Sequence, residues 1–331
     1  CPKGNKMLRE FCKEHNVLHK VPGKAVVASE EIDKEYFDDV ETTAIENGVP
    51  YEKISGEALK NYEPNVTGLE AMIFPTSGVV EATSLIRKLY QIGHRRGAEY
   101  IRGHEVVDIK PKKRSFEVTT RSNKGYESFV TGKVINCAGL YSDVIAKMVN
   151  PNSPYEITPL RGESVKFYSE GNVSMNGMNV YPTPYGVYPN GEKADVGFED
   201  FKRLFDKGEV IKTVGVHLTP TFEKTNQGYE FAKTITIGPA HVGGVGKEDY
   251  VHSRDKGYFL DRVRGFFPNL TLDKLMYNQT GIQAKVKGYK DWIAEPDDKH
   301  PHMFNCIGFD SPLLTACLSM ARYISDHVQH S

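Results

Sequence analysis

The chain has 331 residues, of which 39% are hydrophobic and 26% are charged, and its formal net charge is −1. This composition is typical of a globular protein with one large or two smaller domains. A near-neutral charge argues against a dedicated nucleic-acid-binding protein, and no run approaches the roughly 20 apolar residues of a membrane-spanning helix.

The cysteines and the first residues bear on the compartment. The five cysteines are odd in number and form no CxxC pair, which favours reduced thiols, a non-secreted protein and no zinc site. We therefore expect a cytoplasmic protein, with the mitochondrion as the alternative in a eukaryote. The chain starts at Cys1 without an initiator Met or an apolar signal-peptide core, so we expect a processed or truncated form.

Helices and strands are expected to alternate in the first half of the chain. Apolar residues at helical spacing predict helices, and alternating or continuous apolar runs predict strands. Ser55 is the expected N-cap of a short helix, and Asn123-Lys124-Gly125 is an expected turn. The other expected helices lie at 5–15, 32–47 and 82–96, and the expected strands at 23–28, 69–74, 99–109, 115–120 and 133–138.

Strands predominate after Pro151, which indicates a mostly antiparallel second part. The chain then closes with a helix over 312–328, whose expected buried stripe includes Leu314 and Ile324. The strands expected here lie at 162–168, 179–188, 213–219, 234–237, 283–286, 292–295 and 303–307, with helices at 198–205 and within 251–267.

The stretch around Gly139 is the centre of the predicted site. A buried strand containing Val134 and Ile135 is followed by Ala138 and Gly139, which allow the backbone to turn close to a ligand. Ser142 then suits the N-cap of a helix. A strand, a turn of small residues and a helix N-terminus hold ligands at the strand ends of α/β sheets, although many such turns are plain connections.

A second helix start follows Gly308. Ser311 is a preferred N-cap and Pro312 a preferred first residue, so the free N–H groups there suit a developing anion. The alternative is a well-capped C-terminal helix without a ligand.

Three side chains are candidates for chemistry. His217 lies opposite the apolar face of an alternating strand, where it either lines a cavity and accepts a proton or is simply exposed. Arg161 and Lys285 are candidates for binding a carboxylate, with a surface salt bridge as the alternative. No GxGxxG with a later acidic residue and no Walker A loop occurs in the chain.

Seven segments in the same order resemble the L-2-hydroxyglutarate dehydrogenase/oxidase family. This family belongs to the FAD-dependent oxidoreductases related to D-amino-acid oxidase and glycerol-3-phosphate dehydrogenase. The segments are 23–28, 77–81, 134–143, 159–163, 215–220, 237–240 and 308–315.

The resemblance implies an α/β fold with two domains. One is a doubly wound, FAD/NAD(P)-binding-like domain that lacks its first βαβ unit, and the other is an antiparallel-sheet substrate domain forming an α+β second layer. The expected FAD-binding domain comprises 1–22, 76–150 and 285–331, and the substrate domain comprises 23–75 and 151–284.

The resemblance also implies the roles of the site residues. FAD is the implied cofactor, His217 the catalytic base, and Arg161 and Lys285 the partners of a small carboxylate substrate. The implied cofactor-side residues are Ala138, Gly139, Gly308, Ser311, Pro312 and Thr315, and no metal is expected. The sequence departs from the family in lacking GxGxxG, in Leu313, in Gln283 where Arg is common, and in a longer connection over 185–212.

The expected reaction is the FAD-dependent oxidation of a small L-2-hydroxy acid to the 2-oxo acid, with an unidentified electron acceptor. Two alternatives stay open at the level of sequence. One is an amine, amino-acid or glycerol-3-phosphate flavin oxidoreductase, and the other is a non-catalytic fragment.

Overall fold

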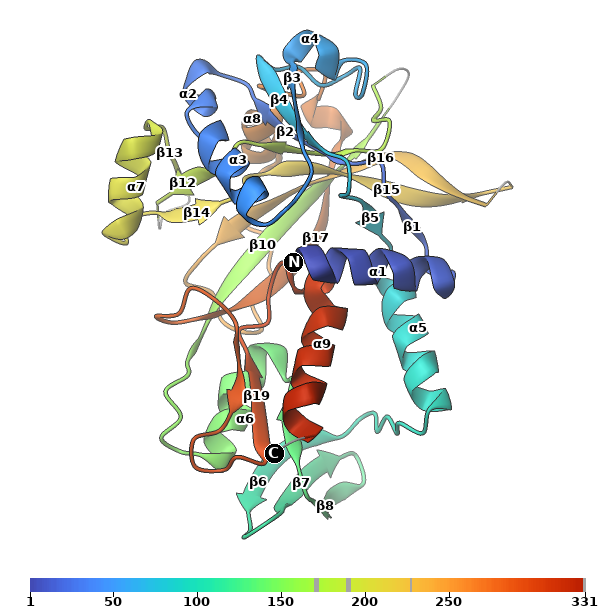
Figure 1. Ribbon diagram of the computed structural model, residues 1–331, viewed down its shortest axis with the longest axis vertical. Helices are drawn as coiled ribbons and strands as arrows, with labels where there is room; N and C mark the ends of the chain where they lie inside the picture. The colour runs from blue at the N-terminus through green and yellow to red at the C-terminus, as the bar shows by residue number, and fades with distance from the viewer. Residues whose placement is uncertain (170–172, 189–191, 227, 330–331) are drawn as a thin grey trace.

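The computed structural model describes residues 1–169, 173–188, 192–226 and 228–329 and has a mixed α/β fold, elongated along one axis (Figure 1). The upper part contains one large sheet, and the lower part contains two smaller sheets. Helix α1 (Pro2–Glu14) lies between the two parts.

The large sheet has eight strands in the order β17-β10-β16-β15-β11-β2-β4-β3. All neighbouring strands pair antiparallel except β2 and β11, which are parallel. In chain order the strands are β2 (Lys24–Ala28), β3 (Glu52–Ser55), β4 (Glu70–Phe74), β10 (Ile157–Tyr168), β11 (Asn179–Pro182), β15 (His217–Thr225), β16 (Gly228–Val242) and β17 (Leu275–Val286).

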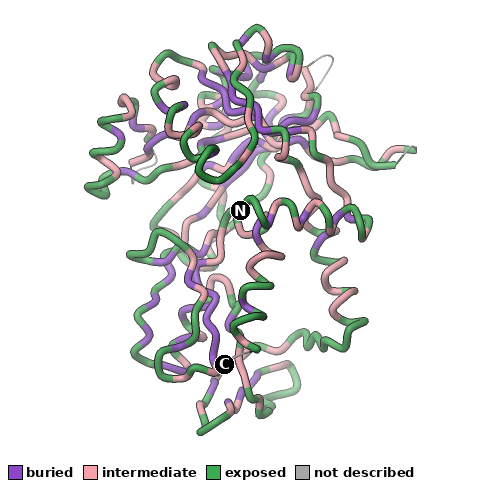
Figure 2. The backbone as a smooth tube through the Cα atoms, viewed as in Figure 1, coloured by how far each residue is buried: buried purple, intermediate pink, exposed green. Residues whose placement is uncertain are grey.

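One face of this sheet carries the main hydrophobic core. Alternate residues of a strand point to opposite faces, so Val180 and Leu218 project together into this core. Phe259 and Val263 of helix α8 (Lys256–Val263) cover them, and all four side chains are buried. Figure 2 shows that buried residues gather along the large sheet.

The opposite face is covered in part by helix α3 (Phe37–Glu46). Phe37 and Ala44 pack there against Val26 and Met72 in a second cluster. Tyr181 lies at the margin of that cluster, on the same face as Val26. The remainder of this face carries the polar side chains described below.

The lower part contains the antiparallel sheet β6-β7-β8 and the mixed sheet β18-β19-β9. Helix α9 packs against α1, where an added Cβ on Gly4 would lie 2.6 Å from the Cα atom of Ala316. The elements are β6 (Glu105–Pro111), β7 (Phe116–Ser122), β8 (Gly125–Thr131), β9 (Val134–Asn136), β18 (Ile293–Pro296), β19 (Met303–Ile307), α5 (Ala82–Arg95), α6 (Ser142–Val149) and α9 (Leu313–Gln329).

Short elements complete the fold. Ser55 caps helix α4 (Gly56–Leu59) by accepting a hydrogen bond from the Ala58 N–H at 3.2 Å, as the sequence predicts. The others are α2 (Glu31–Lys34), α7 (Phe198–Asp206), the 3-10 turns η1 (Gly139–Tyr141) and η2 (Leu272–Lys274), the strand pair β1 (His19–Lys20) and β5 (Val79–Val80), and the sheet of β12 (Tyr185–Val187), β13 (Lys193–Ala194) and β14 (Ile211–Thr213).

Several expected elements differ from the observed ones. The helix expected over 32–47 is two helices, because the chain bends between α2 and α3. The strand expected from 99 begins only at Glu105, and strand β8 was not expected. Ile135 is 47% exposed rather than buried, because β9 is the edge strand of its sheet, and Leu314 is 43% exposed, because α9 packs through Ala316 instead.

The two-domain division stays a prediction. The large sheet draws its strands from 24–74 and 157–286, and β17 crosses the expected boundary at 284/285.

Candidate functional site

The two backbone corners singled out in the sequence lie side by side. Strands β9 and β19 pair in parallel, with Val134 opposite Met303 and Asn136 opposite Asn305. Both strands therefore end at the same edge, where Ala138 and Gly139 follow one strand and Gly308 follows the other. This is the edge at which α/β sheets bind their ligands.

Buried amide groups fix the first corner. The Asn136 side chain donates to the Ser142 carbonyl at 2.7 Å and to Asn305 Oδ1 at 3.0 Å, while its own Oδ1 accepts from the Ala138 N–H at 3.3 Å. Ser142 Oγ donates to the Gly139 carbonyl at 2.7 Å. Because Asn136 is only 2% exposed, these bonds hold the turn firmly against both strands.

Both corner positions have a backbone conformation that favours glycine, which has no Cβ atom. Gly139 has φ +56° and Gly308 has φ +74°, a conformation that side-chain-bearing residues rarely adopt. An added Cβ on Gly308 would lie 2.4 Å from Val286 Cγ2, whereas one on Gly139 would have no atom within 4 Å. The Gly139 backbone is thus open to a close approach from outside.

The start of α9 forms the second corner. Helix α9 begins at Leu313, one residue later than expected, and Ser311 and Pro312 precede it on the exposed surface. The Thr315 N–H donates to the Pro312 carbonyl at 3.1 Å. Asp310 accepts from Trp292 Nε1 at 3.0 Å and its Oδ2 lies 2.5 Å from Lys285 Nζ, so Lys285 is placed beside this corner.

His217 begins β15 on the face opposite the main core. Its Nδ1 lies 3.0 Å from the Gly215 carbonyl, and its ring stacks on Tyr181 with the centroids 3.9 Å apart and 14° between the planes. Burial lowers the pKa of His217 to about 4, so the ring is neutral at pH 7. A neutral ring that donates from Nδ1 keeps its Nε2 lone pair for accepting a proton.

Two further side chains, Lys24 and His241, affect the pKa of His217. The charge of Lys24 and the neighbouring His241 both lower the pKa of His217, after burial. Burial lowers the pKa of His241 to about 4 as well, and the charge of Lys285 adds to that shift. The four side chains therefore form an electrostatically connected group, which we call the basic group: Lys24, His217, His241 and Lys285.

Sequence reasoning missed Lys24 and His241 as site residues. Lys24 was noted only within a matching segment, and His241 only follows another. Alternation in β16 places His241 on a face but does not reveal its neighbours, which come from β10, β15 and β17.

Arg161 does not join the basic group. It is 3% exposed, and its guanidinium contacts Glu163 through Nε and Nη2, Asp249 through Nη1, and Ser253 Oγ through Nη2 at 2.9 Å. Its neighbour Gly162 faces His241, because an added Cβ on Gly162 would lie 3.8 Å from the His241 ring. Since residues alternate along β10, Arg161 points to the opposite face, and its contacts favour a structural role.

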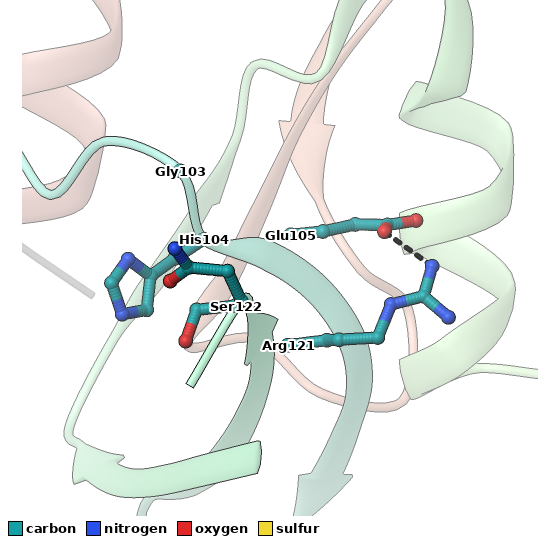
Figure 3. A pocket seen from close by; sticks show the side chains of 6 residues that line it. Gly103, His104, Glu105, Arg121 and Ser122 are labelled. Carbon is teal, nitrogen blue, oxygen red and sulfur yellow. Dashed lines mark hydrogen bonds and ion pairs between the residues drawn. The ribbon is translucent and has the colours of Figure 1, made fainter. Parts of the chain in front are cut away.

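A hollow lies elsewhere on the surface, beside strands β6 and β7. It has a volume of about 450 Å³ and its lining includes Glu105 and Arg121, which pair at 2.6 Å (Figure 3). None of its lining residues belongs to the basic group or to the two corners, so it has no part in the candidate site. Its lining residues are Gly103, His104, Glu105, Arg121, Ser122 and Asn123.

No group of three or more His, Cys, Asp or Glu side chains in the described ranges has an arrangement that could hold a metal ion. Nor is any helix in those ranges sufficiently long and apolar to span a bilayer.

The residues at the two corners fit the flavin ring of FAD. Open space beyond the Gly139 Cα and a positive φ at both glycines allow a flat ring to approach the backbone. The start of α9 places partial positive charge at the same edge, which suits the anionic reduced ring. Ala138, Gly139, Gly308, Ser311, Pro312 and Thr315 are the residues that would hold that end of the cofactor, and these assignments stay predictions.

Known proteins resemble this chain over nearly its whole length. L-2-hydroxyglutarate dehydrogenase of Escherichia coli O17:K52:H18 is 27% identical over 99% of this chain and 78% of its own length. The human mitochondrial L-2-hydroxyglutarate dehydrogenase is 28% identical over 99% and 75%.

Solved structures share the fold. The FAD-bound L-alpha-glycerophosphate oxidase of Mycoplasma pneumoniae superposes with a TM-score of 0.78 at 18% identity, covering 98% of this chain and 78% of that one. L-proline dehydrogenase of P. horikoshii gives 0.74 at 16% identity over 99% and 78%. The family model for FAD dependent oxidoreductases (DAO) matches residues 1–327. The chain therefore belongs to the DAO family of FAD-dependent oxidoreductases, with FAD as its cofactor.

Proposed function

We propose that this protein oxidises a small L-2-hydroxy acid, of the L-2-hydroxyglutarate class, to the corresponding 2-oxo acid. The observation that carries the proposal is the buried His217, whose Nδ1 lies 3.0 Å from the Gly215 carbonyl and whose pKa is lowered to about 4, chiefly by burial, with the charge of Lys24 adding to the shift. The names of the relatives support the substrate class.

His217 acts in this proposal as the general base. Its Nε2 accepts the proton of the substrate hydroxyl, and the imidazolium formed returns that proton to solvent after the reaction. FAD supplies an acceptor for the two electrons and the hydrogen that leave C2. Stacking on Tyr181 and the hydrogen bond to Gly215 hold the ring in one orientation, which aligns Nε2 with the hydroxyl.

Lys285 is the candidate partner for the carboxylate next to the reacting carbon. It lies beside the α9 corner through Asp310, and its side chain is 50% exposed, so it has room to reach a ligand. Arg161 is assigned a structural role instead, because its donors are occupied inside the protein.

The experiment is a substrate panel on the purified, flavin-loaded protein with an artificial dye as the acceptor. We expect reduction of the dye with L-2-hydroxyglutarate, little with D-2-hydroxyglutarate, and none with L-glutamate or sn-glycerol 3-phosphate. Preference for an amino acid or for glycerol 3-phosphate would replace the proposal by the corresponding oxidoreductase. A folded protein that takes up no FAD, as judged by its visible spectrum, would instead indicate a non-catalytic fragment.

The proposal also includes the domain division 1–22, 76–150 and 285–331 against 23–75 and 151–284. Limited proteolysis is its test, since the connections near 22/23, 75/76 and 150/151 should be cleaved before the interiors of the two domains if the division holds, whereas the boundary at 284/285 lies within β17.

A further inference from the structure

Lys24 is a half-buried cation for which the described part of the chain offers no carboxylate partner. Its Nζ lies 4.9 Å from the centre of the Phe74 ring and 5.1 Å from that of Tyr181. Burial lowers its pKa. Aromatic faces compensate a buried ammonium only in part, so an anion beside Lys24 would be stabilised more strongly than at an ordinary surface lysine.

Lys24 lies near His217, the candidate base, because both side chains contact Tyr181. Tyr181 contacts both residues, since the His217 ring stacks on it and the Lys24 ammonium lies against it. Lys24, Phe74 and Tyr181 lie on one face, because Lys24 pairs with Phe74 and Tyr181 packs beside Phe74 in the second cluster. Lys24 and His217 therefore face the same space above the sheet.

The basic group also has a second cation, on the side of the α9 corner. Lys285 pairs there with Asp310 at 2.5 Å, whereas Lys24 lies against the rings of Phe74 and Tyr181 and forms no ion pair within the described part of the chain. The charge of Lys285 lowers the pKa of His241, and Lys24 and His241 both lower the pKa of His217. His217 is thus flanked by one cation toward the α9 corner and by another away from it.

We propose that Lys24 binds the distal carboxylate of a dicarboxylate substrate and so selects 2-hydroxy diacids over 2-hydroxy monoacids. This inference rests on the proposed function for the position of the reacting hydroxyl at His217. With C2 at His217 and its carboxylate toward Lys285, the second carboxylate of a five-carbon diacid extends toward Lys24. No other described cation of the basic group is available there.

The first test measures binding without turnover, so it is independent of the reaction. Isothermal titration calorimetry of the flavin-loaded protein uses glutarate, an unreactive diacid, and pentanoate, the matching monoacid. We expect the wild type to prefer glutarate, and Lys24→Met to weaken glutarate binding by about 10- to 100-fold, the scale of one charge-assisted hydrogen bond. Pentanoate binding stays unchanged in the variant.

Lys20→Met is the matched control. Lys20 also lies over an aromatic ring, with its Nζ 4.8 Å from the centre of Phe231, but it belongs to β1 outside the basic group. We expect Lys20→Met to bind both acids as the wild type does. An equal loss of glutarate affinity in both variants, an unchanged affinity in Lys24→Met, or a wild type without preference for the diacid each overturns the proposal.

The second test is kinetic. With L-2-hydroxyglutarate, Lys24→Met should raise KM by about 10- to 100-fold and change kcat little, because the lost contact is remote from the reacting bond. With L-2-hydroxypentanoate neither constant changes, and Lys24→Arg restores part of the KM. If no hydroxy acid is oxidised by the wild type while the calorimetric preference holds, the proposed reaction fails and the diacid site at Lys24 stands.

Discussion

At the scale of single residues, burial decides what each charged or titratable group can do. His217 and Arg161 both lie on strands of the large sheet, yet one is neutral with a free acceptor and the other is charged with every donor engaged. Their sequence surroundings look alike, since each lies in an alternating strand. The difference follows from the side of the sheet on which each residue falls.

Replacing His217 by Gln tests its role as the base. We expect His217→Gln to lower kcat with L-2-hydroxyglutarate by about 10²-fold or more, the usual contribution of a general base. His94→Gln, on the exposed side of α5, serves as the control and should leave kcat unchanged. Wild-type turnover in a folded His217→Gln protein would remove His217 from the mechanism.

Replacing Arg161 by Met tests its structural role. Glu163 is fully buried, so losing its cation should lower the free energy of unfolding by about 3–5 kcal/mol. Arg121→Met breaks the exposed pair with Glu105 and should cost less than about 1 kcal/mol. Urea unfolding measures both. A stable Arg161→Met protein with a raised KM would return Arg161 to substrate binding.

At the scale of elements, the corner at which we propose that the flavin binds depends on pairing between β9 and β19. The strand over 303–307 was predicted with its observed bounds, because four of its five residues are apolar and the run is short. The proximity of Gly139 and Gly308 could not be derived from the two strands alone, since register between distant strands is set by tertiary packing. Only the family resemblance placed them together.

Adding one methyl group at Gly139 tests that corner. Gly139→Ala introduces a Cβ into open space at φ +56°, so we expect a modest loss of stability and a clear loss of FAD affinity. Gly48→Ala is matched in conformation, at φ +61° with no atom within 4 Å, and lies after α3. Fluorescence titration with FAD should separate the two variants, and equal affinities would contradict the assignment.

At the scale of the whole molecule, most elements were predicted, and so were His217 and Lys285 of the basic group, but Lys24 and His241 were not. The predicted strands and helices follow from apolar periodicity. The place of Lys24 and His241 in the basic group depends instead on neighbours from other strands, which the sequence does not reveal. The strand β8 was missed because its side chains are largely exposed and give no apolar pattern. Local signals thus define elements, and the sheet order defines the site.

Acid sensitivity is a property of the whole fold that follows from the two buried histidines. The pKa values of His217 and His241 are about 4, below the ordinary value of 6.5, so the unfolded chain binds protons first as the pH falls. Stability is therefore complete above pH 6.5 and is lost progressively toward pH 4, by up to about 1.4 kcal/mol per pH unit for each histidine.

Urea unfolding between pH 7 and pH 4 measures this slope. The double variant His217→Gln, His241→Gln should show a shallower loss than the wild type, and the double variant of two exposed histidines, His94→Gln, His327→Gln, should not. Parallel curves for all three proteins would refute the assignment of buried, neutral rings.

The pairing of Asn136 with Asn305 joins positions 169 residues apart in the chain. On the ribosome, Gly139 emerges long before β19 and α9 have been synthesised. The corner at which we propose that the isoalloxazine ring binds is therefore incomplete until β19 and the start of α9 have been made. In this proposal FAD binds only after these late elements have been made, and removal of α9 (Leu313–Gln329) should release flavin even where the large sheet remains folded.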